Sequence, residues 1–257
     1  MKNLLYLFLA ILSYSSVSFA QVKPVKYKDG LTVLNGFSIQ PSKKSQQKPG
    51  VLILPAWMGI DKLSKDVAEN LAKLGYYAFI ADIYGEENYP KDYSQAGVNA
   101  GFYKTNFLEY QKRISLALEQ LVRSGANPDN IVVIGYCFGG TGALESARAH
   151  LKVKGVVSFH GGLGKEATRP IEPITAKVLV CHGADDPYES KEEITAFQQE
   201  MRDTKADWQM IYYANAVHSF TNPEAGNVNS KGAAYNEKAA KRSWEHLKIF
   251  LDEVLSK

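Results

Sequence analysis

A cysteine flanked by glycines stands between a predicted strand and a predicted helix. The apolar run 131–134 is followed by Gly-Tyr-Cys-Phe-Gly-Gly at 135–140, and residues 141–147 are typical of a helix. A nucleophile with small residues two positions to either side is the pattern of a nucleophile elbow, where the chain reverses so sharply that Cβ atoms would clash. Such a turn would hold the Cys137 thiol beside the first amides of a helix, which stabilise a thiolate or an oxyanion. Gly-x-Cys-x-Gly alone is equally compatible with a tight turn around a buried cysteine.

Two later segments supply the partners that a thiol nucleophile needs, a base and an acid that fixes the tautomer of the base. Asp185 and Asp186 lie on the loop that leaves one predicted strand, and His218 lies on the loop after the last one. We therefore expect Cys137, His218 and Asp186 to form a catalytic triad. Asp185 is the alternative acid, and is otherwise a turn-forming residue.

The remaining histidines give no sign of a metal site. His160 follows another predicted strand and either lines the substrate pocket or packs within a turn. His182 is expected to be structural and to point away from the pocket. None of the five histidines forms a His-Glu-x-x-His motif, and zinc-ligand spacings and phosphate loops are missing from the sequence. We expect neither a metal nor a cofactor.

Strands and helices alternate along the chain. The turn signal Asp29-Gly30 predicts a β-hairpin over 24–40. Residues 84–99, rich in Gly, Asn, Tyr and Pro, are predicted to be a long loop near the site. The other expected strands are 51–54, 77–81, 131–134, 155–159, 178–181 and 208–213, and the expected helices are 61–74, 107–122, 141–147, one that begins at Ser190 with a capping box, and 233–255.

This alternation predicts a single α/β domain over residues 21–257 with a mostly parallel central sheet flanked by helices. Chemistry in such sheets occurs at the carboxyl ends of the strands. The order nucleophile, acid, histidine along the chain is that of the α/β-hydrolase fold.

The N-terminal residues 1–20 are predicted to be a signal peptide. They combine Lys2, an apolar run at 4–12 and small residues before Gln21. We expect export, and so a periplasmic or secreted protein without membrane attachment after cleavage; an uncleaved N-terminal anchor is the alternative. The net charge of +3 is too small to indicate nucleic-acid binding.

An exported protein with two cysteines is by default expected to contain a disulfide. Here the predicted strand 155–159 should lie between the strands that carry Cys137 and Cys181. Two sheet spacings separate their Cα atoms by about 10 Å, which exceeds the limit of roughly 7 Å for a disulfide. We predict two free thiols, with Cys181 buried and inert.

Three motifs together resemble the dienelactone hydrolase family: Gly-Tyr-Cys-Phe-Gly-Gly, His-Gly-Ala-Asp-Asp-Pro at 182–187 and Val-His-Ser-Phe at 217–220. The resemblance covers the chain from about Val51 to the closing helix. It implies that Cys137 is the nucleophile, His218 the base and Asp186 the orienting acid. The segment 54–60 is similar to the oxyanion loop of the family, which implies that the backbone amides of Trp57 and Phe138 bind the oxyanion.

The sequence departs from the family at two positions. Members that open dienelactones carry an acidic residue in the oxyanion loop where this chain has Ala56, and an arginine four residues after the histidine where it has Asn222. The family arginine at the second position helps to hold the carboxylate of a dienelactone. We therefore expect the fold and chemistry of the family to carry over to this chain better than its named substrate does. The first change removes a carboxylate that would raise the thiol pKa, and we hypothesise a standing thiolate–imidazolium pair between Cys137 and His218.

The leading functional hypothesis is an exported hydrolase of small esters, lactones or thioesters, acting through an acyl-cysteine. An aromatic pocket is expected from Trp57, Tyr136, Phe138 and Tyr188, with His160 as a further candidate. A non-catalytic binding protein on a hydrolase fold and an acyltransferase are the alternatives. The sequence leaves the oligomeric state open.

Overall fold

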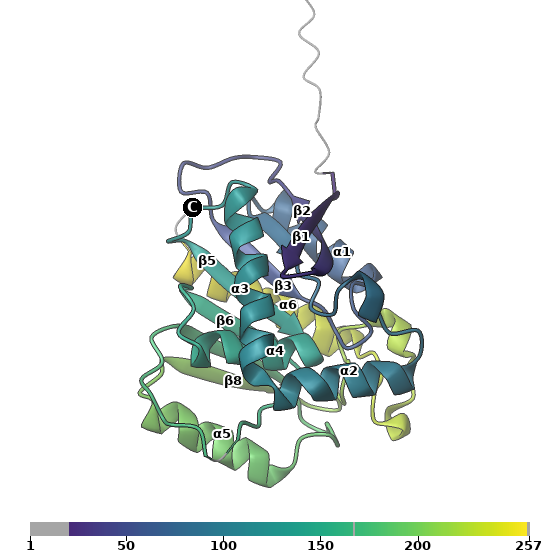
Figure 1. Cartoon of the computed structure of the whole chain (residues 1–257). Helices are drawn as coiled ribbons and strands as arrows, with labels where there is room; N and C mark the ends of the chain where they lie inside the picture. Colours follow the sequence, from purple (N-terminus) through teal and green to yellow (C-terminus); the bar gives the residue numbers. More distant parts are fainter. Residues whose placement is uncertain (1–20, 167, 256–257) are drawn as a thin grey trace, which may run out of the picture.

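Eight strands form one sheet with the order β1-β2-β4-β3-β5-β6-β7-β8. The computed structural model describes residues 21–166 and 168–255, so the predicted signal peptide lies outside the described residues (Figure 1). The hairpin β1–β2 is antiparallel, β2 joins β4 antiparallel, and all pairs from β4 to β8 are parallel. The strands are β1 (Lys23–Asp29), β2 (Thr32–Ile39), β3 (Gly50–Leu54), β4 (Tyr77–Ile80), β5 (Ile131–Tyr136), β6 (Gly155–Phe159), β7 (Lys177–Gly183) and β8 (Trp208–Tyr213).

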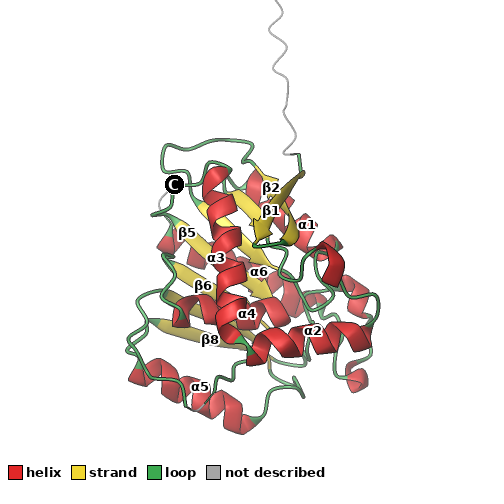
Figure 2. Ribbon diagram, viewed as in Figure 1, coloured by secondary structure: helices red, strands yellow, loops and turns green. Residues whose placement is uncertain are grey.

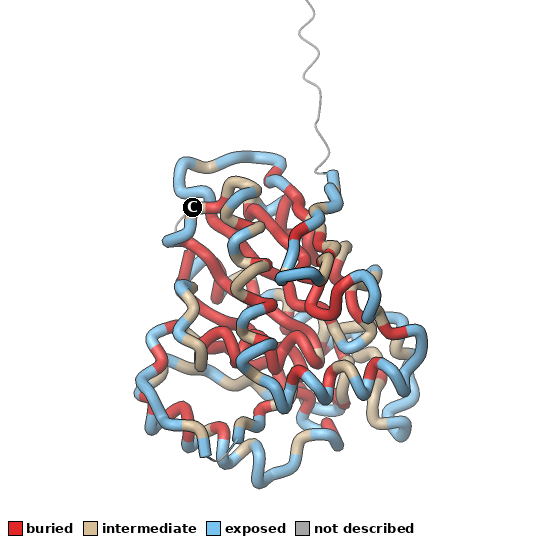
Figure 3. Tube along the Cα trace, viewed as in Figure 1, coloured by how far each residue is buried: buried red, intermediate tan, exposed pale blue. Residues whose placement is uncertain are grey.

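Helices cover both faces of the sheet (Figure 2). One buried apolar cluster joins one sheet face to α2, α3, α4 and α5, and a second joins the other face to α1 and α6. The central strands and most of α4 are buried, whereas the outer faces of the other helices are exposed (Figure 3). The α-helices are α1 (Lys62–Lys73), α2 (Tyr93–Thr105), α3 (Phe107–Arg123), α4 (Phe138–Arg148), α5 (Lys191–Asp203) and α6 (Glu237–Val254), with short 3-10 turns at Glu86–Asn88, Pro223–Ala225 and Asn229–Lys231.

The expected α/β-hydrolase fold is confirmed, including the hairpin around Gly30 and the capping box at the start of α5. There the Ser190 side chain accepts from the Glu193 N–H and the Glu193 side chain accepts from the Ser190 N–H. The last helix starts later than predicted. It begins at Glu237 because Asn236 caps it, and residue 233 instead pairs with His218 in an isolated bridge.

The predicted long loop over residues 84–99 is wrong in its second half, where α2 begins at Tyr93. Asp92 caps this helix by accepting a hydrogen bond from the Gln95 N–H. The buried positions of α2 are 96, 100 and 103, a helical spacing occupied by two alanines and one tyrosine. Because of these small residues and two interior glycines, the sequence of α2 lacks the large apolar residues at helical spacing that would have predicted a helix.

The topology brings the ends of β5, β7 and β8 to one edge of the sheet. These strands are parallel, so residues that directly follow them lie at the same edge. β6 lies between β5 and β7, as predicted, and Cys137 and Cys181 are both free thiols. Within the described part of the chain, every helix is too short or too polar to cross a membrane.

Candidate active site

Cys137 occupies a sharp, strained turn between β5 and α4. Its φ of 54° and ψ of −117° are unfavourable for a residue with a side chain. A Cβ at Gly135 would lie 1.8 Å from the carbonyl oxygen of Gly139, and a Cβ at Gly139 would lie 2.0 Å from that of Leu54. Only glycine fits at both positions, which is the steric requirement of a nucleophile elbow.

A continuous chain of hydrogen bonds connects Cys137, His218 and Asp186. His218 Nε2 lies 3.0 Å from Cys137 Sγ, and His218 Nδ1 lies 2.9 Å from Asp186 Oδ2. These distances allow His218 to exchange a proton with the sulfur while the carboxylate fixes the tautomer of the ring. The structure thus brings together the three side chains that the sequence singled out.

The neighbouring aspartates have different environments. The Asp186 side chain is fully buried, and its other oxygen, Oδ1, accepts a hydrogen bond from the Tyr188 N–H at 3.0 Å. Asp185 is exposed at the turn, where its N–H donates to the Ala216 carbonyl. Only Asp186 is therefore held toward His218.

The charges around Cys137 favour a thiolate. Burial would raise the pKa of the Cys137 thiol, but hydrogen bonding to His218 and the charge on His218 outweigh burial and lower that pKa. The Phe138 N–H and the ammonium group of Lys104 act in the same direction. For His218, burial would lower the pKa, but hydrogen bonds to Asp186 and Cys137 raise it to about 10. Both shifts favour a proton on the imidazole and a negative charge on the sulfur.

His160 supports the nucleophile from below and does not line a pocket, which corrects one expectation. Its side chain is buried, and Nδ1 accepts a hydrogen bond from the Cys137 N–H at 3.2 Å. Nε2 lies 2.8 Å from the Thr221 hydroxyl. Burial, together with the charge on His218, keeps the pKa of His160 well below its ordinary value.

Tyr136 is also not a pocket residue. Side chains alternate between the two faces of a strand, so Tyr136 points away from Cys137 and stacks on Phe159 with 4.7 Å between ring centroids. The residue is only 4% exposed. His182, expected to be structural, is buried against the ring of Tyr212.

The segment expected to be the oxyanion loop lies against the elbow. The absence of a side chain at Gly139 lets the Leu54 and Pro55 carbonyls lie close to the elbow, and the Gly59 N–H donates to the Ala56 carbonyl across a tight turn. Tyr84 donates its hydroxyl proton to the Trp57 carbonyl at 2.8 Å, which anchors the loop. Among the described residues the Trp57 N–H has no hydrogen-bond partner, so it can donate to a ligand.

Aromatic side chains surround the approach to the triad. The indole of Trp57 stacks on Tyr93 of α2 with 5.7 Å between centroids, and the exposed ring of Tyr188 meets His218 edge to face at 5.2 Å. Phe138 is buried and stacks on Tyr110 beneath the elbow. Of the four aromatic residues expected to form the pocket, Trp57 and Tyr188 are accessible.

Sequence reasoning missed other polar residues near the triad. Tyr84 and Lys104 belong to segment 84–105, whose helix went unrecognised. Thr141 could have been found, because it follows Cys137 by four residues on the same helix and so lies one turn away. Glu189 had no sequence signal beyond its closeness to Asp186.

Cys181 differs from Cys137 in every respect that governs reactivity. It is fully buried, and burial raises the pKa of its thiol to about 12, although a hydrogen bond with Tyr213 opposes the shift. The prediction of a free, buried Cys181 is confirmed, and we expect such a protonated, inaccessible thiol to be inert.

An eight-stranded, mostly parallel sheet with a nucleophile elbow and a Cys–His–Asp arrangement at its carboxyl edge defines an α/β hydrolase. The model of the dienelactone hydrolase family matches residues 34–255. The chain belongs to the dienelactone hydrolase family, and it is an ester or lactone hydrolase.

The chain is similar to individual proteins over much of its length. A crystal structure of a dienelactone hydrolase-like promiscuous phosphotriesterase from metagenomic libraries has a TM-score of 0.87 and 35% sequence identity, and the match covers 93% of this chain and all of that one. A "probable 2-oxo-3-(5-oxofuran-2-ylidene)propanoate lactonase" from Bradyrhizobium is 27% identical over 79% of this chain and 83% of its own length. An uncharacterised protein of Caenorhabditis elegans is 37% identical over 48% of this chain and 78% of its own length.

Proposed function

We propose that the chain hydrolyses small esters, lactones and thioesters through a covalent acyl-cysteine on Cys137. The observation that carries this proposal is the unbroken contact from Asp186 through His218 to the sulfur, at 2.9 Å and 3.0 Å. A nucleophile, a base in contact with it and a buried acid that orients the base together perform acyl transfer.

In the first half of the reaction the Cys137 thiolate attacks the carbonyl carbon, and the π electrons move to the carbonyl oxygen. The backbone N–H groups of Trp57 and Phe138 would stabilise that oxyanion. The bond to the leaving oxygen or sulfur then breaks, and the leaving group takes the proton from the His218 imidazolium.

In the second half a water molecule attacks the acyl-cysteine while His218 Nε2 takes one proton from the water. The bond between sulfur and the acyl carbon breaks, which releases the carboxylic acid and leaves the thiolate. The enzyme returns to its starting protonation state, and each cycle consumes one ester and one water.

Hydrolysis of p-nitrophenyl acetate, combined with intact mass measurement, tests this proposal. Cys137→Ala should lower kcat/KM by about 10³-fold or more, because members of a triad act as a unit. Rapid quenching should trap wild-type protein with one added acetyl group, and that adduct should be missing from Cys137→Ala. Cys181→Ala, which removes the inert thiol, is the matched control. Turnover that survives Cys137→Ala would overturn the mechanism.

Other substrates and other acyl acceptors can be tested at the same site. The Bradyrhizobium relative favours lactones as test substrates, and the metagenomic neighbour favours phosphotriesters. Added alcohols or amines show whether the acyl group also passes to acceptors other than water. Binding of esters without turnover would favour a non-catalytic binding protein instead.

We further propose that the protein is exported, to the periplasm or the medium, with Gln21 as the first residue of the mature chain. The charged start, apolar run and small residues of 1–20 support this proposal. Intact mass of protein recovered outside the cytoplasm of a bacterial host tests it. A chain that stays in the cytoplasm with residues 1–20 attached contradicts it.

A further inference from the structure

A polar cavity of about 200 Å³ lies beside the triad, between α2, α4 and the loops after β6 and β7. Tyr188, whose ring meets that of His218, forms part of its wall. Lys104 also lines it and is close enough to Cys137 to lower the pKa of the thiol. The mechanism proposed above assigns no role to the other side chains that line this cavity.

Three polar groups converge on one point of the cavity wall, Gly162. A Cβ built there would lie 3.0 Å from Thr141 Oγ1, 3.5 Å from Glu189 Oε1 and 3.5 Å from Lys104 Nζ. A side chain at position 162 would therefore intrude among a hydroxyl, a carboxylate and an ammonium group.

These three groups have unused hydrogen-bonding capacity. Thr141 is buried, with only 6% of its surface exposed. Its hydroxyl has no hydrogen-bond partner among the described residues. Glu189 uses Oε2 to accept from the Leu163 N–H at 3.0 Å, which leaves Oε1 available. Lys104 forms no ion pair with the described residues. A buried polar group without a partner is costly, and a ligand would remove that cost here.

The charges of the cavity argue against an anionic ligand. Three basic and four acidic side chains line it, which are Lys104, Lys165, Arg169, Glu145, Glu166, Glu189 and Glu193. Arg169 is already paired with Glu145. A carboxylate ligand would thus meet the Glu189 carboxylate with no excess of positive charge to hold it. Burial raises the pKa of Glu189 to about 7, and Glu193 and Asp186 contribute to that rise against the Leu163 N–H and Lys104.

A neutral group that both accepts and donates satisfies all three partners. A hydroxyl can accept from Lys104 and donate to Glu189 Oε1, while the rotatable hydroxyl of Thr141 serves as donor or acceptor. Thr141 is four residues beyond Cys137 on α4, a rise of about 6 Å, so the ligand hydroxyl would be a few bonds from the acyl carbon.

We propose that Lys104, Thr141 and Glu189, around Gly162, form a subsite for a hydroxyl group of the substrate, so that hydroxyl-bearing acyl esters are preferred to their unsubstituted analogues. This inference rests on the proposed acyl transfer to Cys137. It adds a substrate class and three residues that determine specificity.

Four p-nitrophenyl esters test the subsite: butyrate, 3-hydroxybutyrate, 3-methoxybutyrate and hemisuccinate. At the third carbon of the acyl chain they carry only hydrogen, a hydroxyl, a methoxy oxygen that accepts but cannot donate, and a carboxylate, respectively. A hydrogen bond to a charged group should favour the 3-hydroxybutyrate over the butyrate by roughly tenfold or more in kcat/KM. The 3-methoxybutyrate should lose most of that preference because it cannot donate to Glu189.

The preference is measured as the ratio of kcat/KM for 3-hydroxybutyrate to that for butyrate within each variant, so changes in overall activity cancel. Thr141→Val and Gly162→Ala should each bring the ratio toward one, the first by removing a hydroxyl and the second by filling the space. Thr195→Val and Gly101→Ala make the same chemical changes at exposed helix positions, and both should keep the wild-type ratio.

Folding is checked separately. Because the Thr141 hydroxyl has no partner, Thr141→Val should keep or raise the Tm, so a lost preference in this variant cannot come from unfolding. A wild-type ratio near one, or a preference for the hemisuccinate, would overturn the inference. Failure of the proposed function is distinguishable: none of the four esters would be turned over, or turnover would survive Cys137→Ala.

Discussion

The imidazole of His160 accepts a hydrogen bond from the backbone N–H of Cys137, with 3.2 Å between the nitrogens. The same N–H also donates to the Phe159 carbonyl at 3.0 Å. His160 has a positive φ of 41° and contacts the Thr221 hydroxyl through its other nitrogen. The strained nucleophile is therefore held from beneath by a buried histidine.

We predict that His160→Ala lowers the free energy of unfolding by about 1–3 kcal/mol, because it leaves a cavity and deprives the partly buried Thr221 hydroxyl of its partner. kcat should fall more than KM changes. His160→Asn should restore part of both losses, since its amide oxygen can accept from Cys137. Exposed His150, which pairs with Glu172, provides the control as His150→Ala. Urea denaturation and steady-state kinetics measure these effects, and a harmless His160→Ala would contradict the positioning role.

A comparison of Asp186→Asn with Asp185→Asn tests the identity of the acid. Asp186→Asn should lower kcat/KM by roughly 10⁴-fold, because the amide favours the wrong tautomer of His218. Asp185→Asn should change it by less than about twofold, because that side chain is exposed away from the ring. If the order of the two effects is reversed in p-nitrophenyl acetate assays, Asp185 is the acid.

The fold and the triad were predictable because each depends on local patterns. Apolar runs marked the strands, and the glycines around Cys137 marked a turn that only glycine permits. The pocket was less predictable because it depends on which way side chains point at strand ends. Tyr136 and His160 adjoin strand ends, yet one packs in the core and the other supports the elbow. Lys104 was missed for a different reason, because the buried face of α2 consists mainly of alanines.

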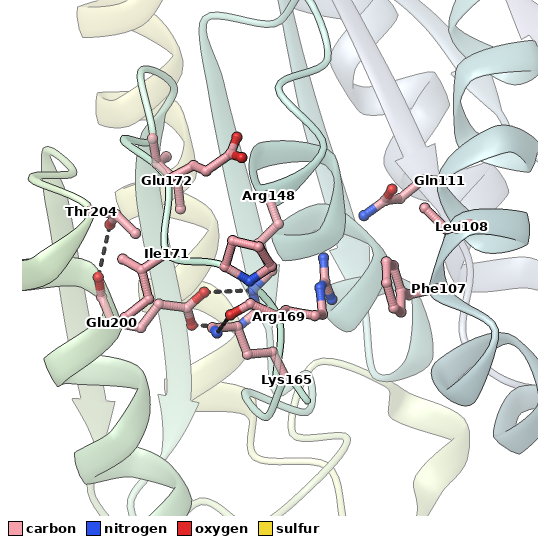
Figure 4. Close-up of a pocket in the computed structure, with 12 residues that line it drawn as sticks. Phe107, Leu108, Gln111, Arg148, Lys165, Arg169, Ile171, Glu172, Glu200 and Thr204 are labelled. Atoms are coloured by element: carbon pink, nitrogen blue, oxygen red, sulfur yellow. Dashed lines mark hydrogen bonds and ion pairs between the residues drawn. The ribbon is translucent and has the colours of Figure 1, made fainter. Parts of the chain in front are cut away.

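A buried network of charges beside the active-site cavity connects α4, α5 and the loop after β6. Arg148 forms ion pairs with Glu200 at 2.7 Å and with Glu145 at 3.0 Å, and Arg169 pairs with Glu145 at 2.9 Å. Figure 4 shows Arg148 pointing at Glu200, with Arg169 near Phe107. The Arg148, Glu145 and Glu200 side chains are at most 7% exposed.

Glu145→Gln should lower the free energy of unfolding by about 3 kcal/mol, because it removes the buried counter-charge of Arg169 and leaves Arg148 paired with Glu200 alone. Burial would raise the pKa of Glu145, but Arg169 and Arg148 outweigh it and lower that pKa below its ordinary value of 4.5. The stabilisation is therefore complete above about pH 4.5 and is lost as the pH falls through the lowered value.

Urea denaturation of wild type and Glu145→Gln between pH 7 and pH 3 measures this difference. The difference in free energy of unfolding between the two proteins should be constant near neutral pH and should become smaller in acid. Glu119→Gln, which removes an exposed pair with Arg123, should cost less than about 1 kcal/mol. Equal effects of the two substitutions would mean that the buried network contributes no more than a surface pair.

The resting state of Cys137 gives the last prediction. The thiol pKa is lowered by His218 against the effect of burial, and that of His218 is raised to about 10. The thiolate should thus persist to lower pH than that of a free cysteine, and it should be lost only as the pH falls through the lowered thiol pKa. The alkylation rate of Cys137 with iodoacetamide should accordingly be on its plateau at neutral pH.

Three variants and the second cysteine test this prediction. Ala56→Glu should move the pH at which the alkylation rate rises to a higher value, because a carboxylate in the oxyanion loop repels the thiolate. His218→Ala should shift it toward about pH 8.5. Cys181 should not react. Ala184→Glu, which places a carboxylate at an exposed position, is the control for Ala56→Glu. A wild-type rate that still rises toward pH 8.5 would show that Cys137 rests as a thiol and that another group replaces the missing acid.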